Sequence, residues 1–503
     1  NLLNPNDIEA ISVLKDAASA AIYGSRAANG VVLVKTKRGF KNQKTTISYE
    51  ATYGSSEATM LPDLNFDAAY AMEFRNLAAT NFGSPALYSS EQIQLAKSPN
   101  NWWKNPYNDL FQSAPVNQHN LSVSGGSEKT NYRIGLGILD QESIATGGNY
   151  YDRVNLRFNL DTEVTDQITV GTTMSLSRGK QTGYAYNSSN LSFGPVAIGA
   201  SIHNVLGPKY NDDGTYAIQT SGFVGYGVGP GTGRLSVMGY VNGDYTDRET
   251  ITNNILMNSY VAYEPVENLV LKATAAVRSR SMHLSAFDKS VKNYYPDGTS
   301  FNAPANLRTA ERENEELFTE TYFLTADYNI DLGNENNLSA LIGYSQEENY
   351  VEGFTAFRDG FLSDSVQVLD AGQPTNQQNT GTRTGFAVMS YFARINFDHL
   401  GKYLFEANVR RDGSSRFKND KWGVFPSFSA GWIVSEENFL SNSNSIDFLK
   451  IRASVGELGN SNIDNFAFAK KLSLTEGYSF GGTLVPGVGQ STLGNENLSW
   501  EKT

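Results

Sequence analysis

Few residues in this 503-residue chain have the types and spacing that catalysis requires. The four histidines, His119, His203, His283 and His399, are scattered, and none belongs to an H-E-x-x-H zinc motif. No G-x-S-x-G sequence supplies a nucleophilic serine, and the chain has no cysteine. The glycine-rich stretch GYGVGPGTG lacks P-loop spacing, and YNDDGTY and YYPDGTSF are better explained as Asp-Gly turns than as calcium loops. We therefore expect no enzyme and no bound cofactor or metal.

Two short clusters remain as candidate ligand contacts. In NNWWKNPY, Trp102 and Trp103 could stack on a sugar or meet a partner, although packing at an interface is the simpler interpretation. In RDGSSRF, Arg411, Asp412 and Arg416 fall close together in sequence. They could contact a ligand, or they could form a salt-bridged loop. Both alternatives stay open for both clusters.

The elements that must position these side chains are β-strands. In RVNLRFNLD (153–161), Val154, Leu156, Phe158 and Leu160 alternate with polar residues, and successive side chains of a strand point to opposite faces. The same alternation recurs over TISYEATYG, NYRIGLGI and LTADYNIDLG. Periodicity alone leaves two architectures open. A soluble β-sandwich buries the apolar face between sheets, and a membrane barrel turns it outward.

Segment lengths and connectors favour the barrel. Many of the predicted strands are longer than the usual soluble strand of about 5–6 residues. Tight connectors such as TDQ and GNEN contrast with long connections near 180–248 and 282–312, and this alternation is typical of outer-membrane barrels. Residues 66–80 predict a helix with Phe66, Tyr70 and Phe74 on one stripe. The thirteen predicted strands are 45–57, 116–126, 130–141, 152–163, 167–178, 251–264, 268–281, 317–331, 337–350, 385–398, 402–412, 423–434 and 446–457.

Composition agrees with a β-rich chain and excludes some classes of function. Tyr and Phe each occur 27 times, which suits strands. The formal net charge is −12, and no basic patch offers a nucleic-acid footprint. No run of about 18 apolar residues predicts a transmembrane helix. The chain starts without Met and stops at NLSWEKT, so we expect an internal fragment of a longer protein.

The first 39 residues differ from the meander that follows them. DIEAISVLK predicts a strand, and Asp16 is a suitable N-cap for the short helix AASAAIYG, which Gly24 can end in a left-handed conformation. VVLVKTKRG predicts a second, apolar strand with a basic tail. We expect a compact β-α-β unit here.

This N-terminal stretch resembles a known family. NPNDIEAISVLKDAASAAIYGSRAANGVVLVKTKRG is similar to the end of the plug domain of TonB-dependent outer-membrane transporters, in the SusC/RagA branch of Bacteroidota. RRDGSSRFKNDKWGVFPSFSAGWIVSEENFL and LKIRASVGELGNSNI resemble the later barrel of that branch. The matching plug motif includes Asp7, Asp16, Tyr23, Gly24, Asn29 and Gly30, for which we expect structural roles.

The resemblance implies a fold and a function. It implies an all-β fold, a 22-stranded transmembrane antiparallel barrel around a plug. Residues 1–40 would end the plug domain, and residues 41–503 would form the first and middle parts of the barrel. About thirteen strands cannot close such a barrel. The family imports nutrients too large for porins, such as oligosaccharides or peptides, under a SusD-like surface lipoprotein lid, and TonB displaces the plug through an N-terminal segment not seen here.

The resemblance also assigns the two faces of the ribbon. Val154, Leu156, Phe158 and Leu160 would face the lipid bilayer, and Arg157 and Asn159 the lumen or the plug. Two other functions remain open: a TonB-dependent receptor for a siderophore or another ligand without a lid, and a soluble β-sandwich binding module or adhesin. The strand-end aromatic residues expected to form interfacial girdles are Tyr150, Tyr151, Tyr263 and Trp432.

Overall fold

The structure is a computed structural model of the 503-residue chain. It describes residues 3–14, 21–24, 30–61, 67–97, 111–183, 210–211, 213–217, 219–220, 233–234, 239, 242–290, 292–294, 300–301, 308–440 and 446–503.

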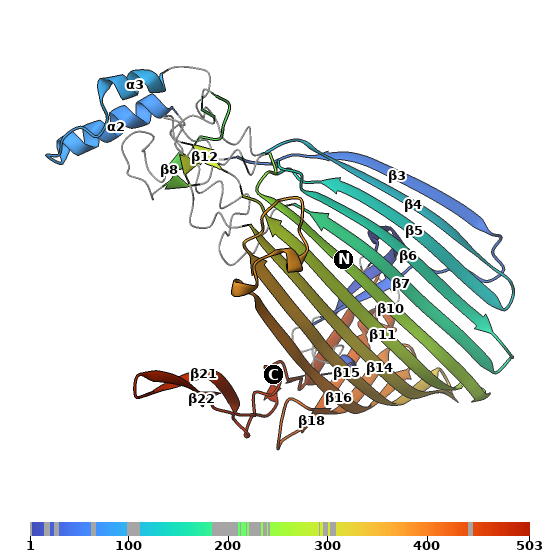
Figure 1. Ribbon diagram of the computed structural model, residues 1–503. Helices are drawn as coiled ribbons and strands as arrows, with labels where there is room; N and C mark the ends of the chain where they lie inside the picture. The colour runs from blue at the N-terminus through green and yellow to red at the C-terminus, as the bar shows by residue number, and fades with distance from the viewer. Residues whose placement is uncertain are drawn as a thin grey trace.

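Within the described residues, thirteen antiparallel strands form one large sheet (Figure 1). Each strand pairs with its neighbours in chain order, and the sheet is open because β3 and β19 remain its two edges. The strands are β3 (Thr46–Ser56), β4 (Ala114–Gly126), β5 (Thr130–Glu142), β6 (Tyr150–Glu163), β7 (Ile168–Thr182), β10 (Thr246–Val266), β11 (Leu269–Asp288), β14 (Thr309–Gly333), β15 (Asn336–Asp359), β16 (Gln378–His399), β17 (Tyr403–Ser414), β18 (Trp422–Ile433) and β19 (Lys450–Gly456).

The thirteen strands of this sheet are the thirteen that the sequence predicts, in the same order. Several are longer than expected. β14 has 25 residues and β15 has 24, because their ends continue as paired strands through polar stretches such as TAERENEE that do not alternate. The tight connectors are also confirmed. Asn268, Asn334, Glu335 and Leu400 adopt positive φ in the turns after β10, β14 and β16.

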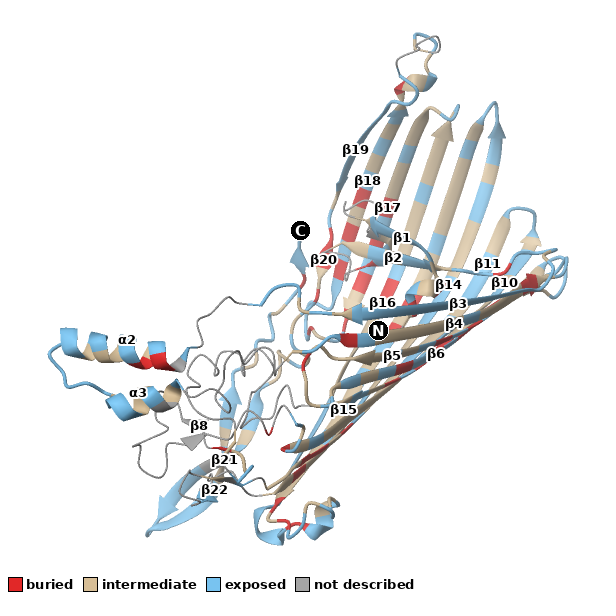
Figure 2. Ribbon diagram, turned by 90° about the horizontal axis from the view of Figure 1, so that it is seen from above, coloured by how far each residue is buried: buried red, intermediate tan, exposed pale blue. Residues whose placement is uncertain are grey.

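The two faces of the sheet are those that alternation predicts. On β6, Val154 is 46% exposed and Leu156 36%, whereas Arg157 is 5% exposed and Asn159 1%. The polar face is the concave side, where β1 (Ile8–Leu14) and β2 (Val31–Thr36) lie (Figure 2). No second sheet covers the apolar face in the part of the chain that the structure describes. This arrangement disagrees with a β-sandwich.

Outward aromatic side chains form two bands. Toward the long connections, the ring centroids of Tyr344 and Tyr391 lie 5.4 Å apart, and those of Tyr391 and Trp422 lie 6.1 Å apart. Toward the short turns, Tyr403 stacks on Trp432 at 6.4 Å. Such bands are typical of the two interfaces of a membrane.

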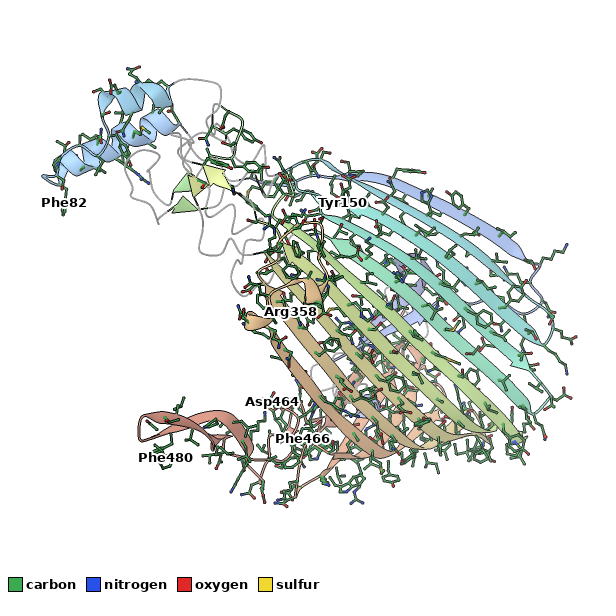
Figure 3. The ribbon with its side chains drawn as sticks, in the orientation of Figure 1. Phe82, Tyr150, Arg358, Asp464, Phe466 and Phe480 are labelled. Carbon is green, nitrogen blue, oxygen red and sulfur yellow. The ribbon has the colours of Figure 1, made fainter. Side chains whose placement is uncertain are left out.

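Three of the four expected girdle residues point outward and one does not. Tyr150, at the long-connection end of β6 (Figure 3), is 45% exposed, Tyr263 41% and Trp432 37%. Tyr151 points inward instead, and its hydroxyl lies 3.1 Å from where a Cβ on Gly179 would be. The expectation for Tyr151 is wrong because neighbouring residues of an unbroken strand cannot share a face.

The N-terminal segment is a small antiparallel unit. A 3₁₀ turn, η1 (Pro5–Asp7), precedes β1, and β1 pairs with β2 so that Ile11 opposes Val34. Of the expected helix 17–24, only the end lies among the described residues, where η2 (Ala21–Tyr23) is a 3₁₀ turn. Gly24 follows it at φ +85°, the left-handed conformation that the sequence predicts. Asp16 and Asn29 lie outside the described residues.

A helical insertion follows β3. α2 (Ala68–Asn81) confirms the predicted helix, and the Asp67 side chain caps it by accepting a hydrogen bond from the Tyr70 backbone N–H. Tyr70 and Phe74 stack on each other, yet they are 54% and 59% exposed, while Met72 is buried. Phe66 lies outside the described residues. α3 (Ser90–Ala96) completes the insertion. No described helix combines the length and the apolar character needed to span a membrane.

At the end opposite the short turns, connections pack against the ends of strands. Phe361, after β15, packs against Phe287 and Ala310. Phe417, between β17 and β18, packs with Phe425 and Trp500. The remaining elements are β8 (Gln219–Thr220), β9 (Gly233–Arg234), β12 (Asn293–Tyr294), β13 (Ser300–Phe301), η4 (Leu369–Ala371), η5 (Pro374–Asn376), η6 (Val434–Glu436), β20 (Gly459–Asn460), β21 (Lys471–Phe480), β22 (Thr483–Thr492) and β23 (Glu501–Lys502).

Candidate functional site: the concave wall around the N-terminal segment

The first contact region joins the N-terminal segment to β4 and β5. Asn4 donates a hydrogen bond to Asn120 at 2.6 Å, and Arg133 lies 3.6 Å from the Asp7 carboxylate. Asp7 is buried. On β5, a Cβ at Gly137 would lie 2.2 Å from the Asn4 amide nitrogen. Glycine at this position of β5 therefore lets the Asn4 side chain approach the strand backbone closely.

The next contacts run along β6. The Arg157 guanidinium donates to the Thr36 hydroxyl at 2.6 Å and to the Ser175 hydroxyl at 2.8 Å. Asn159 donates to the Lys37 carbonyl at 3.1 Å. The family resemblance assigns these two residues to the lumen or the plug. Arg157 contacts the last residue of β2, and Asn159 contacts the residue after it.

The basic tail after β2 pairs with the acidic end of β6. Arg38 lies 2.8 Å from the Asp161 carboxylate, and Lys41 pairs with Glu163. Asp161 also accepts a hydrogen bond from the Tyr260 hydroxyl at 2.9 Å. The wall from β4 to β6 thus holds the segment through complementary charges as well as neutral hydrogen bonds.

A second contact region lies on β17. Arg410 donates to the Ile22 carbonyl at 2.7 Å and to the Asp412 carboxylate at 2.6 Å. Asp412 is fully buried and Arg410 is 8% exposed. The Arg410 guanidinium occupies the space beside Gly24, where a Cβ would lie 2.7 Å from Nη2. The turn at Ile22–Gly24 is therefore held by a buried, charge-neutralised arginine.

The structure does not bring Arg411, Asp412 and Arg416 together. Arg411 points outward, with its guanidinium 4.8 Å from the centre of the Trp422 ring. Asp412 points inward to Arg410, a residue that the sequence analysis did not select. Strand alternation in the sequence could have selected Arg410. The outward positions of β17 are Tyr403, Phe405, Ala407, Val409 and Arg411, so Arg410 and Asp412 fall on the inner face.

Arg416 instead joins two connections. Its Nε donates to the Asn465 side chain at 2.9 Å, and Nη1 donates to the Ser461 carbonyl at 3.2 Å. The guanidinium also lies 4.0 Å from the centre of the Phe386 ring. Arg416 therefore positions the connection after β20 rather than a residue of the concave wall.

A hollow of about 710 Å³ with a mixed polar and apolar lining lies nearer the short turns. Its lining includes the inward polar residues Asn329, Asn396, Glu406 and Arg452. No group of His, Asp or Glu in the described residues is arranged to hold a metal ion. Of the other expected site residues, Tyr23 lies within the Ile22–Gly24 turn and is 45% exposed, and Gly30 adopts φ +89°. Trp102 and Trp103 lie outside the described residues.

Comparison with known proteins agrees with this geometry. No protein-family model matches the chain. The chain is 31% identical over 514 residues to TonB-dependent receptor P26 of Formosa agariphila, in an alignment that covers all of this chain and 48% of that protein. It is 28% identical over 520 residues to TonB-dependent receptor SusC of Bacteroides thetaiotaomicron, again covering all of this chain and 48% of the relative. The chain thus spans about half the length of the curated relatives it matches.

The structure of the RagAB peptide transporter superposes with a TM-score of 0.82 at 24% identity, over all of this chain and 56% of that chain. Over its whole length the chain is therefore similar to TonB-dependent receptors, SusC among them, and it shares the fold of the RagA-type barrel. Its open thirteen-stranded sheet accordingly has the fold of a transmembrane β-barrel wall, and we expect its apolar outward face to meet lipid. The N-terminal segment lies against the concave face of this sheet.

Proposed function

We propose that this chain belongs to an outer-membrane importer that takes up large nutrients, oligosaccharides or peptides, with energy delivered by TonB and a SusD-like lipoprotein as its lid. Residues 1–40 end the plug domain, and residues 41–503 belong to the barrel. The observation that carries the proposal is the N-terminal segment seated between the β4–β6 wall and Arg410 on β17. A segment held by hydrogen bonds on both sides, and by ion pairs on the β5–β6 side, can block a barrel and still be released without breaking a covalent bond.

The chemistry of the wall suits a plug that moves. The contacts to the segment are single hydrogen bonds, two partly exposed ion pairs, Arg38–Asp161 and Lys41–Glu163, and the largely buried pair of Asp7 and Arg133. The hydrogen bonds and the partly exposed pairs are individually worth about 0.5–1.5 kcal/mol. Loops at the long-connection end, including the stretch with Trp102 and Trp103, select the substrate in this proposal. SusC and the RagAB peptide transporter leave the choice between glycan and peptide open.

Deletion of the complete gene from its bacterium tests this function. The deletion strain should lose growth on either an oligosaccharide mixture or an oligopeptide mixture as sole carbon source, and the gene in trans should restore it. A proton uncoupler should stop uptake of the labelled nutrient, and affinity purification in mild detergent should recover a lipoprotein partner. Wild-type growth on both mixtures together with failed uptake of a siderophore would favour the lidless receptor instead. Recovery of the protein in the soluble fraction would refute both.

A further inference from the structure

A groove crosses the outward face of the sheet. It has a volume of about 810 Å³ and extends over β10, β11 and β14–β17, which are consecutive neighbours in the sheet. Its lining is almost wholly apolar, with Val261, Leu324, Ile342 and Val409 among the wall residues. Five strand spacings of about 4.8 Å give it a length of about 24 Å. The groove is therefore long and narrow, as an extended hydrocarbon chain is.

Alanines alternate with larger side chains along the floor of the groove. The register aligns Leu271 with Ala326, Ala326 with Ile342, and Ile342 with Ala393 across four neighbouring strands. The short side chains of Ala326 and Ala393 leave space between larger neighbours. The Ile342 side chain projects from the sheet and is 64% exposed. Unlike a uniformly covered barrel surface, this face has a depression into which a chain can settle with contacts on three sides.

One end of the groove carries a cation. Arg411 lines it and lies over the Trp422 ring, which belongs to the aromatic band with Tyr344 and Tyr391. Arg411 lies three residues before the end of β17 at Ser414, on the side of the long connections. Its depth is therefore that of the lipid headgroups in the outer leaflet. Arg411 makes no ion pair with any described carboxylate.

The outward carboxylates lie two or more strands away. Glu320 on β14 accepts a hydrogen bond from Tyr322, and Glu348 on β15 accepts one from Gln346. These acidic groups disfavour an anion above β14 and β15. The Arg411 cation favours an anion above β17. The charge pattern thus orients an amphiphile with its anionic head at Arg411 and its tail along the floor.

We propose that this groove binds a phosphate-bearing lipid of the outer leaflet, with one phosphate on the Arg411 guanidinium and one acyl chain between the walls. Arg411 supplies a planar set of donors already fixed by the Trp422 ring, so little side-chain entropy is lost on binding. The proposal requires only that lipid covers the outward face, and it does not depend on which nutrient is imported.

Lipid retention by the complete protein tests the proposal. The protein is purified in a mild detergent, washed extensively, and its retained phosphate lipid is measured by native mass spectrometry and by phosphorus assay. We expect about one lipid per chain in the wild type and at least a tenfold lower occupancy in Arg411→Gln. Ala393→Phe fills the floor with a lipid-compatible side chain, and it should lose the lipid while the barrel still folds.

Arg178→Gln is the matched control, because Arg178 is exposed on the outward face of β7 but lines no part of this groove. It should retain the lipid. Equal retention in all four proteins would overturn the proposal, and so would equal binding of a neutral lipid added back to washed protein. A lipid-free dimer that only Ala393→Phe dissociates would show that a second copy of the chain fills the groove, and would overturn it as well.

Discussion

Arg410 is the residue on which the β17 contact depends. It neutralises the fully buried Asp412 and donates to the Ile22 carbonyl. Removing one partner of a buried ion pair leaves an uncompensated charge and costs about 3–5 kcal/mol. We expect Arg410→Met in the complete protein to loosen the Ile22–Gly24 turn and to lower amide hydrogen-exchange protection there at least tenfold.

Arg411→Met is the control for this change, because the neighbouring arginine points to the outward face. It should leave protection of the turn unchanged. The double variant Arg410→Met with Asp412→Leu should recover part of the loss, since it removes the stranded carboxylate. Unchanged protection in Arg410→Met would mean that the turn is held by other contacts.

Glu437 gives the short-turn end a dependence on pH. It accepts hydrogen bonds from the Tyr403 hydroxyl at 2.6 Å and the Trp432 indole at 3.1 Å. Chiefly the Tyr403 bond, then the Trp432 bond, lowers the pKa of Glu437 below its usual value. A carboxyl whose pKa is lower in the folded state stabilises the fold above its unfolded pKa, and this contribution is lost as pH falls through the folded value.

We therefore expect Trp432 emission to change when Glu437 is protonated. The change should begin as the pH falls from about 5, just above the usual pKa of a glutamate, and should be complete below the folded pKa of Glu437. Fluorescence titration of the complete protein measures it. Glu437→Gln should remove that step from the titration. Glu436→Gln should keep it, because Glu436 makes no such bond with a described residue. A step that survives in Glu437→Gln would assign the transition to another carboxyl.

At the scale of the strand, β6 shows how strongly the two faces differ. Leu156 lies at the middle of the strand on the lipid-facing side. An arginine at the bilayer midplane costs about 2–4 kcal/mol on this face of a barrel. We expect Leu156→Arg to lower the unfolding free energy of the complete barrel in lipid vesicles by that amount, measured by urea titration.

Thr274→Arg on β11 is the matched lumen-facing change. Thr274 is aligned with Tyr260 and Phe323 on the inner face, where a guanidinium can stack on a ring and meet water. Its effect should stay within about 1 kcal/mol, as is usual for substitutions away from a packed core. Equal destabilisation by the two arginines would contradict the assignment of the faces.

The strands, short turns and face assignment could be predicted because their signals are local. Alternation in RVNLRFNLD fixes which residues share a side, and a turn such as GNEN is specified by residues that tolerate positive φ. The contact of Arg410 with the Ile22–Gly24 turn could be predicted only in part. Strand parity places Arg410 and Asp412 inward, but the partner carbonyl at Ile22 lies 388 residues away in sequence. The helix α2 shows the same limit, since a stripe of Tyr70 and Phe74 predicts the helix but not what covers it.

At the scale of the whole molecule, the two contact regions differ in how they are connected. Residues 36–41 lead through a short turn into β3, so the wall from β4 to β6 and the end of the segment are covalently tied neighbours. The Ile22–Gly24 turn has no such tie to β17. If the segment is displaced during transport, the β17 contact must break while the β6 contact can persist.

Reversible cross-linking separates these roles. This chain has no native cysteine to interfere, and any cysteine elsewhere in the complete protein is replaced first. A reducible bifunctional thiol reagent would join Ile22→Cys to Arg410→Cys in one complete protein and Thr36→Cys to Arg157→Cys in another, two pairs whose native side chain and backbone groups are hydrogen-bonded. We expect the first link to abolish nutrient uptake until it is reduced and the second to leave most of it. The corresponding single-cysteine proteins, treated with the reagent, control for loss of each arginine. Uptake that survives the Ile22–Arg410 link would mean that substrate passes without release of this turn, because a covalent bridge there holds the segment against the wall throughout the cycle.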